Sequence, residues 1–195
     1  MDQVKFFNSI AKDWDNIIKV DEKKINYLLS KIDIKEDDYI LDVGTGTGVL
    51  IPFLVKLCPK GKIKAVDISC NMLDVARKKF NDINNVEFTL LNVETDNLDE
   101  KFNKIVLYSM FPHLKNKTNT IKKLVQKNLL DCGKLIIAHS DSREYLNNMH
   151  KNTDKRVSES RLIDVNEQKK IFEDAGLKVK EAFEDDNIYY VVLEK

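Results

Sequence analysis

The residues best suited to chemistry gather around one short, glycine-rich stretch. Gly44, Gly46 and Gly48 directly follow the apolar run Tyr39–Val43, in which Asp42 is the only charged residue. The mostly apolar residues after the glycines have helical spacing. A strand, a glycine-rich turn and a helix together bring backbone N–H groups against a ligand at the helix N-terminus. This stretch is therefore predicted to be a ligand cradle.

A second carboxylate follows the next predicted strand. Residues Lys62–Val66 form a mostly apolar run, and Asp67 stands directly after it. Nucleoside-binding folds place a carboxylate at the end of this strand, where it accepts hydrogen bonds from both ribose hydroxyls. Asp67 is therefore predicted to bind a ribose beside the glycine turn.

The spacing of the three glycines distinguishes between two classes of nucleoside-containing ligand. The dinucleotide pattern G-x-G-x-x-G fails here, because its sixth position, counted from Gly44, is Val49. The pattern G-x-G-x-G with Asp42 two residues upstream instead resembles motif I of class I S-adenosylmethionine-dependent methyltransferases. Asp67–Leu73 resembles their D-x-S-x-x-M-L stretch. The N-terminal segment matches their F-x-x-x-A-x-x-W-D pattern at Phe7, Ala11, Trp14 and Asp15.

This resemblance covers nearly the whole chain and implies S-adenosylmethionine as the cofactor. In such enzymes the glycine turn approaches the methionine portion, and the adenine lies near the residues after the second and third strands. Asn92 stands where relatives carry an acid for the adenine amino group, and its carbonyl oxygen can accept the same hydrogen bond. The implied cofactor-binding residues are Trp14, Asp42, Gly44, Thr45, Gly46, Gly48, Asp67, Ile68, Met72, Asn92, Val93, Glu94 and Tyr108.

Three histidines follow the strands predicted to flank the acceptor side. His113 follows the strand over residues 102–109, His139 ends the strand over residues 134–138, and His150 lies in a polar segment. Neighbouring strands lie about 4.8 Å apart, so His113 and His139 are expected to converge on one pocket, with His150 reaching it from the loop. Two hypotheses remain open: a histidine acts as general base, or the three hold a divalent metal ion such as zinc. Arg143 is a further catalytic candidate that could clamp a carboxylate or phosphate.

The element pattern predicts an α/β fold with a Rossmann-like doubly wound sheet. The resemblance implies seven strands in the order 3-2-1-4-5-7-6, with the last strand antiparallel. Residues 1–195 are expected to form a single domain, with a helical cap over residues 1–34. Further helices are expected over residues 5–20 and 115–130, the latter stopping at Cys132–Gly133. The apolar residues in 140–164 show no helical or strand periodicity, and this segment is expected to form a lid-like loop.

Charge and composition narrow the function classes. The 32 basic and 32 acidic residues balance, so no basic surplus points to nucleic acid. The chain has no apolar run of about 18 residues, so no membrane span is expected. The N-terminus lacks the layout of a secretory signal, and the three cysteines are scattered. A cytoplasmic protein is therefore expected, either a monomer or a homodimer.

The interpretation that follows is methyl transfer from S-adenosylmethionine to a small-molecule acceptor, with a histidine cluster on the acceptor side. Two alternatives remain open. A nicotinamide-dependent oxidoreductase shares the strand, turn, helix and Asp67. A non-catalytic cofactor- or metal-binding module would bind the same ligand without turnover.

Overall fold

The computed structural model describes residues 2–195, and Met1 lies outside the described residues. Its centre is a seven-stranded sheet in the order β3-β2-β1-β4-β5-β7-β6. Strands β1 to β5 run parallel, and β7 runs antiparallel to both β5 and β6. The predicted fold class and strand order are confirmed. The strands are β1 (Tyr39–Val43), β2 (Lys62–Asp67), β3 (Val86–Leu90), β4 (Phe102–Tyr108), β5 (Leu129–His139), β6 (Lys178–Glu184) and β7 (Tyr189–Glu194).

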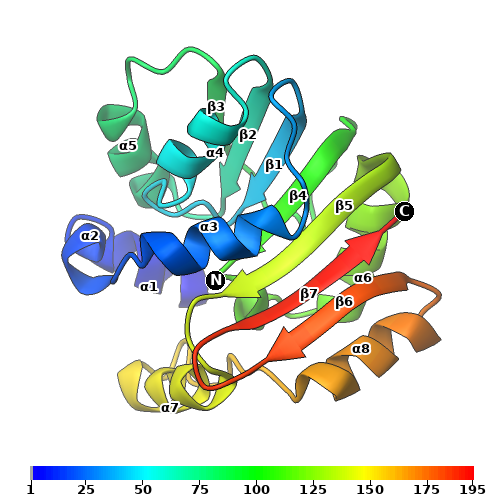
Figure 1. Cartoon of the computed structure of the whole chain (residues 1–195). Coiled ribbons are helices and arrows are strands. Elements are labelled where there is room, and N and C mark those ends of the chain that lie inside the picture. Colours follow the sequence, from blue (N-terminus) through cyan, green and yellow to red (C-terminus); the bar gives the residue numbers. More distant parts are fainter. Residues whose placement is uncertain (1) are drawn as a thin grey trace.

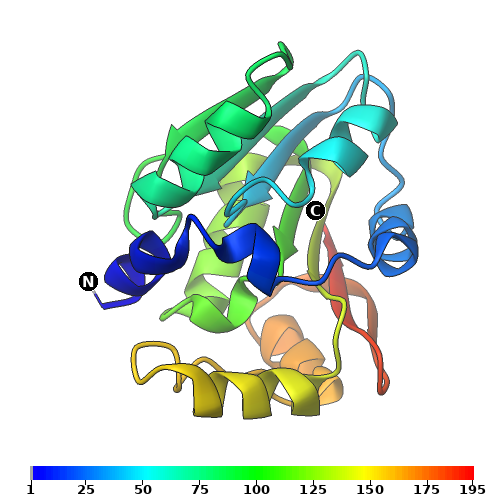
Figure 2. The same ribbon diagram turned by 90° about the vertical axis from the view of Figure 1, so that its left-hand side faces the viewer.

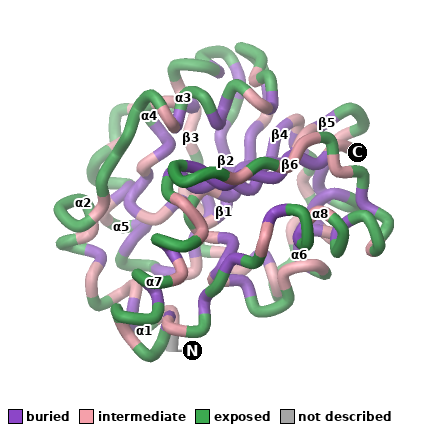
Figure 3. Tube along the Cα trace, turned by 60° about the horizontal axis from the view of Figure 1, so that its bottom comes forward, coloured by how far each residue is buried: buried purple, intermediate pink, exposed green. Residues whose placement is uncertain are grey.

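Helices cover both faces of this sheet (Figure 1). One apolar cluster packs α3 and α4 on one face, and a second packs α6 and α8 on the other. The central strands are buried on both faces because their runs are almost wholly apolar (Figure 3). The helices are α1 (Asp2–Ile10), α2 (Trp14–Ile17), α3 (Glu22–Ser30), α4 (Ile51–Leu57), α5 (Cys70–Lys79), α6 (Lys117–Lys123), α7 (Arg143–Thr153) and α8 (Val165–Asp174).

Two helical segments lie beside the carboxyl ends of the parallel strands. Helices α1 and α2 lie along one part of this edge, and α7 lies along another (Figures 1 and 2). Ligands of open α/β sheets bind at this edge, where the strand order reverses between β1 and β4. The fold thus encloses the predicted site between the N-terminal helices and α7.

Three local predictions were wrong. The single helix expected over residues 5–20 is two helices, α1 and α2, with a turn at residues 11–13. The lid-like loop at residues 140–164 contains the eleven-residue helix α7. The helix expected to reach residue 130 ends in a π-helical turn at Asn128, and β5 begins at Leu129.

The irregularity expected to stop that helix lies inside β5 instead. Cys132 has a left-handed backbone with φ of 62°, and the pairing of β4 with β5 shifts its register between Phe102 and Lys104. Gly133 fits there because a Cβ atom would lie 2.7 Å from the carbonyl oxygen of Leu130. The glycine therefore permits a bulge in a strand and does not end a helix.

No helix within residues 2–195 is long and apolar enough to cross a membrane.

Candidate functional site

The glycine turn holds backbone in close contact with its neighbours. Gly44 has φ of 71° and Gly48 has φ of 86°, in the region that favours glycine. A Cβ atom on Gly44 would lie 2.8 Å from the Met110 side chain, and one on Gly48 would lie 2.5 Å from the Phe80 ring. Helix α4 begins only at Ile51, so residues 44–50 form a turn between β1 and the helix.

Asp67 joins the end of β2 to this turn. Its carboxylate accepts hydrogen bonds from the backbone N–H of Gly46 and of Ser69, each at 2.8 Å. Burial raises the pKa of Asp67, while these backbone hydrogen bonds oppose the rise. The predicted ribose-binding carboxylate therefore lies directly beside the glycine turn.

Asp42 and Thr45 place polar atoms without partners under the same turn. Within residues 2–195, neither Asp42 Oδ2 nor the Thr45 hydroxyl has a hydrogen-bond partner, although both are buried. Burial raises the pKa of Asp42 to about 7; the neighbouring Thr45 hydroxyl opposes the rise, and the nearby charge of Asp67 adds to it. Buried polar atoms are normally paired, so Asp42 and Thr45 keep acceptor capacity under the turn.

A small hollow adjoins Asp67 on the β3 side. It has a volume of about 190 Å³ and is lined by Val4, Ile68, Leu90, Leu91, Asn92 and Asp96. Ile68 and Asn92 were predicted for the adenine. The other four residues were missed, because Val4 comes from a helix remote in sequence and the others carry no motif. Apolar walls with a polar end suit a flat heterocyclic base.

The remaining predicted cofactor residues occupy other positions. Val93 belongs to the apolar core, and Met72 is buried in α5. The Glu94 carboxylate accepts hydrogen bonds from the backbone N–H groups of Lys115 and Asn116, at 3.0 and 2.7 Å. These contacts hold the segment before α6.

Trp14 and Tyr108 lie on different sides of the turn. The Trp14 indole nitrogen lies 3.7 Å from the Cβ position of Gly46, above the cofactor cradle. The Tyr108 hydroxyl donates to Ser140 at 2.8 Å. Trp14 therefore covers the turn, whereas Tyr108 supports the chain after β5.

The N-terminal helices are fastened to the cofactor side by side-chain hydrogen bonds. The Ser69 hydroxyl donates to the Asn8 side chain at 2.6 Å, and the Thr47 hydroxyl donates to Asp15 at 2.5 Å. Lys79 also pairs with Asp15 at 2.7 Å. These contacts hold α1 and α2 over the glycine turn and the N-terminus of α5.

The structure brings two of the three histidines into contact. The rings of His113 and His150 lie 5.0 Å apart between centroids. Both bond to Ser160: His113 Nδ1 lies 2.9 Å from its hydroxyl, and His150 Nδ1 lies 2.8 Å from its carbonyl oxygen. A carbonyl can only accept, so His150 carries its proton on Nδ1 and its lone pair on Nε2. Ser160 was not predicted, since no motif marks it.

His139 lies deeper, against Tyr189. The two residues are register partners on β5 and β7, with ring centroids 6.0 Å apart. His139 is 1% exposed and Tyr189 is fully buried. Neither ring nitrogen of His139 has a hydrogen-bond partner in the described part of the chain. The Tyr189 hydroxyl has none there either. Tyr189 is a further buried polar group beside His139 that the sequence did not reveal.

All three imidazoles are neutral near pH 7. Burial lowers the pKa of His139 to about 3, and the other two histidines add to the shift. Burial also lowers the pKa of His113 and of His150. The site therefore presents neutral rings, so a titration at the ordinary imidazole value of about 6.5 is not expected.

The metal hypothesis lacks support from the donor geometry. Among residues 2–195, no group of three or more His, Cys, Asp or Glu side chains could hold a metal ion. The Nδ1 atoms of His113 and His150 are directed to Ser160.

Arg143 makes a protein contact at the start of α7. Its guanidinium donates to both carboxylate oxygens of Glu184, at 3.0 to 3.2 Å. Two parallel hydrogen bonds of this kind fix geometry. Arg143 therefore fastens α7 to β6.

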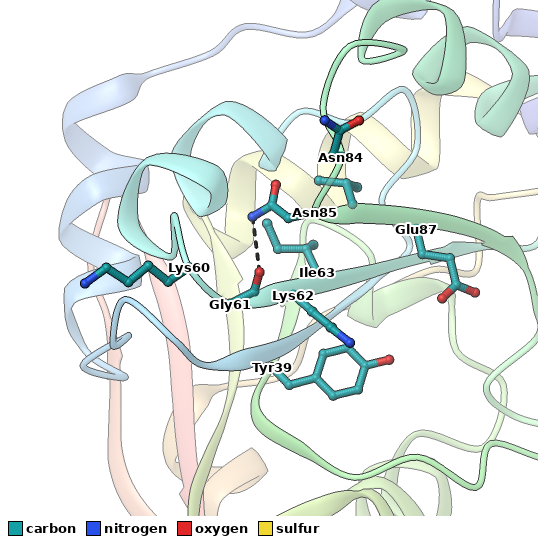
Figure 4. Close-up of a pocket in the computed structure, with 9 residues that line it drawn as sticks. Tyr39, Lys60, Gly61, Lys62, Ile63, Asn84, Asn85 and Glu87 are labelled. Carbon is teal, nitrogen blue, oxygen red and sulfur yellow. Dashed lines mark hydrogen bonds between the residues drawn. The ribbon is translucent and has the colours of Figure 1, made fainter.

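A larger hollow lies at the opposite end of the sheet. It has a volume of about 420 Å³ and is lined by residues at the starts of β1, β2 and β3, including Tyr39, Lys62 and Glu87 (Figure 4). Asn85 crosses it to donate to the Gly61 carbonyl at 3.3 Å. Ligands of this fold class bind at the carboxyl ends of the strands, which is where the smaller hollow beside Asp67 lies.

Comparison with known families agrees with this geometry. A family model described as "Methyltransferase domain" matches residues 34–176. The chain belongs to this methyltransferase family. It is a member of the class I S-adenosylmethionine-dependent methyltransferases, which sets the oxidoreductase aside.

Curated relatives of this methyltransferase match about two thirds of its length. The chain is 37% identical over 122 residues to a malonyl-[acyl-carrier protein] O-methyltransferase of Acetivibrio thermocellus, covering 62% of this chain and 43% of that protein. It is 30% identical over 137 residues to the protein of the same name from Priestia megaterium, covering 69% and 49%. The chain thus spans about half the length of these curated relatives.

Solved structures share the fold of the methyltransferase over its whole length. An S-adenosylmethionine-dependent methyltransferase from Aquifex aeolicus superposes with a TM-score of 0.73 at 24% identity, covering 95% of this chain and 97% of that one. A TehB-like methyltransferase from Corynebacterium glutamicum gives a TM-score of 0.69 at 17% identity, covering 98% of each chain.

Proposed function

We propose that this methyltransferase methylates the carboxylate of a small acyl acceptor, which is received among His113, His139, His150 and Tyr189. One observation carries the proposal: His139 and Tyr189 bury three polar atoms that bond to nothing within residues 2–195. Buried donors of this kind usually have a partner. A methyl acceptor with two oxygen atoms would supply such a hydrogen-bond partner.

The cofactor fits the residues at the neighbouring turn. Asp42 and Thr45 hold buried, unpartnered oxygens there, and an ammonium group such as that of the methionine moiety would supply donors to them. Asp67 would hold the ribose hydroxyls, and the 190 Å³ hollow would hold the adenine. Bound S-adenosylmethionine supplies a methyl group on a positively charged sulfur, and its transfer to a carboxylate leaves uncharged products.

The loop after β4 brings the acceptor pocket to this turn. Met110 lies against Gly44, and the backbone N–H of His113 donates to the Met110 carbonyl at 2.9 Å. The ring of Phe7 lies between Trp14 and His113, with centroid distances of 5.9 and 5.2 Å. The acceptor would therefore be held next to the cofactor, where alignment supplies most of the rate enhancement.

Neutral donors suit a carboxylate acceptor. A fixed cation on the acceptor would stabilise the charged reactants more than the less charged transition state, and only differential stabilisation raises the rate. The imidazoles and the phenol can orient oxygen atoms without adding charge, and Arg143 is paired with Glu184. A carboxylate also needs no general base, which suits imidazoles whose pKa values are lowered.

The names of the relatives favour the same acceptor chemistry. Both are named as O-methyltransferases of a malonyl group on acyl-carrier protein. A malonyl thioester ends in a carboxylate, so it is the acceptor to test first.

A second candidate is an acceptor that must lose a proton, such as a hydroxyl, thiol or amine. His150 favours it, because its Nε2 atom carries a lone pair that can accept a proton. The lowered pKa of His150 makes this ring a weak base.

Methyl transfer from labelled S-adenosylmethionine to malonyl and succinyl thioesters tests the proposal. A methyl ester hydrolyses in mild alkali and releases volatile labelled methanol, whereas methyl ethers, thioethers and amines do not. We expect alkali-volatile label with at least one thioester. Alkali-stable product from a hydroxyl, thiol or amine acceptor would instead select the second candidate.

Neighbouring tyrosines provide a matched pair of variants for this assay. Tyr189→Phe removes the unpartnered hydroxyl and should lower kcat/KM about tenfold or more. Tyr190→Phe removes a hydroxyl that bonds to Glu181 on the other face of the sheet, and it should leave kcat/KM unchanged. Equal effects of the two changes would remove Tyr189 from the acceptor pocket.

A further inference from the structure

Ser160 connects the two histidine rings that lie in contact. It is buried, and it ends the turn that follows α7. Its hydroxyl lies 2.9 Å from His113 Nδ1, and its carbonyl oxygen lies 2.8 Å from His150 Nδ1. One residue therefore bonds to the same nitrogen of both rings, but through two different chemical groups.

The carbonyl of Ser160 fixes the proton of His150. A carbonyl oxygen only accepts, so the neutral ring of His150 donates from Nδ1 and keeps its lone pair on Nε2. The hydrogen bond that one ring nitrogen makes sets which nitrogen carries the proton. His150 can therefore accept a hydrogen bond or a proton at Nε2, but the neutral ring cannot donate one there.

The hydroxyl of Ser160 fixes His113 in the opposite form. A hydroxyl can donate to Nδ1 or accept from it. If it accepted, its own proton would need another acceptor, and within residues 2–195 this hydroxyl bonds only to His113. Buried donors are normally paired, so the Ser160 hydroxyl donates to His113 Nδ1, and the proton of His113 lies on Nε2.

We infer that Ser160 is a positioning residue that holds His113 and His150 in opposite tautomers, so that the acceptor meets one N–H donor, on His113, and one lone pair, on His150. Within the described residues, each ring spends Nδ1 on Ser160, which leaves each Nε2 atom for a ligand. The inference rests on the proposed function. A carboxylate acceptor would bind through His113, whereas a hydroxyl, thiol or amine acceptor would meet His150.

Nuclear magnetic resonance of the ring nitrogens tests the two tautomers without an assay of activity. Spectra of isotope-labelled protein that correlate each ring nitrogen with the ring C–H protons show which nitrogen carries the proton. The wild-type protein should carry it on Nε2 of His113 and on Nδ1 of His150. Ser160→Ala should move the Nδ1 signal of His113 to the position of an unbonded ring nitrogen. Both nitrogens of His150 should keep their signals, because the backbone carbonyl remains.

Asparagine variants test which ring serves the acceptor, because the asparagine amide can replace Nδ1 but does not reach the position of Nε2. In His113→Asn the amide oxygen can still accept from the Ser160 hydroxyl, and the donor at Nε2 is lost. With the thioester that is methylated, kcat/KM should fall about tenfold or more. In His150→Asn the amide nitrogen can still donate to the Ser160 carbonyl, and the loss should be smaller, about threefold.

Serine variants test the positioning role in the same assay. Ser160→Ala should lower kcat/KM about threefold or more, and Ser160→Thr, which keeps a hydroxyl, should restore most of that loss. Ser158→Ala is the matched control. The Ser158 hydroxyl is exposed and donates to the Lys155 carbonyl at 3.1 Å, so its removal should leave kcat/KM unchanged.

The contrary results separate this inference from the proposed function. A proton on Nδ1 of His113 in the wild-type protein, or a His113 signal that does not respond to Ser160→Ala, would overturn the tautomers. Equal kcat/KM values of Ser160→Ala and Ser158→Ala would overturn the positioning role. If the spectra agree but only a hydroxyl, thiol or amine is methylated, with the larger loss in His150→Asn, the carboxylate acceptor is wrong and the inference stands. The larger loss in His150→Asn with a carboxylate acceptor would overturn it.

Discussion

Gly44→Ala should disturb the cofactor turn far more than ordinary backbone strain does. With φ of 71°, an alanine at this position is strained by about 1–2 kcal/mol. Its Cβ atom would also lie 2.8 Å from both Cβ and Cγ of Met110, and overpacking of this kind costs about 1–3 kcal/mol. The free energy of unfolding should therefore fall by about 2–5 kcal/mol, and the Tm by about 4–20 °C.

Gly176→Ala is the matched control. Gly176 has φ of 80°, but a Cβ atom there would meet nothing within 4 Å. This variant carries the strain alone, about 1–2 kcal/mol, so its Tm should fall by about 2–8 °C. The difference in stability loss between the two variants measures the cost of the contact with Met110.

Binding separates the two variants further. Because Met110 leads into His113, displacing it should shift both the turn and the loop after β4. Calorimetric titration with S-adenosylhomocysteine should show at least a tenfold loss of affinity in Gly44→Ala and no change in Gly176→Ala. Equal Tm losses, or unchanged affinity in Gly44→Ala, would refute the role assigned to the close contact.

Three further outcomes are expected. Asp67→Ala should weaken S-adenosylmethionine binding at least tenfold in titrations, since two ribose hydroxyls lose a charged acceptor worth about 1.5–3 kcal/mol; unchanged affinity in a folded variant would remove Asp67 from the site. His139 has a folded pKa of about 3, below its unfolded value, so its contribution to stability is present above about pH 6.5 and is lost as the pH falls toward 3. His139→Gln should therefore gain stability relative to wild type between pH 7.5 and 5 in denaturant titrations, and a constant difference would contradict the burial effect. Hydrogen exchange in α7 should slow when cofactor and acceptor are both bound, and identical exchange would mean that the helix does not act as a lid.

The sheet could be predicted because the residues that define each strand are adjacent in the sequence. Each parallel strand is a short apolar run between turn residues, and the motif at Gly44–Gly48 fixed which end of the sheet holds the ligand. The carboxylate of Asp67 lies beside that turn as expected, because both stand at the carboxyl ends of the neighbouring strands β1 and β2. Local pattern and fold agree here.

Helix α7 could not be predicted from its own residues. Within its span only Leu146 and His150 are buried, and Tyr145 and Met149 are exposed, so no apolar stripe marks it. Its start is capped by Ser142, whose hydroxyl accepts from the Tyr145 N–H at 3.2 Å, and it is held by Arg143 on Glu184. Glu184 lies 41 residues away on β6, and local sequence does not specify such a partner.

The proposed acceptor site is likewise set by contacts between remote segments. His139 meets Tyr189 only because β7 inserts beside β5, and His113 meets His150 only because residues after α7 return Ser160 to both rings. Helix α1 joins this pocket to the cofactor side, since Phe7 contacts the His113 ring while the next residue, Asn8, bonds to Ser69. Any displacement of α1 must therefore change both sides at once. The proposed cofactor site depends on backbone geometry that the spacing of the glycines indicates, whereas the proposed acceptor site depends on side chains that only the folded chain brings together.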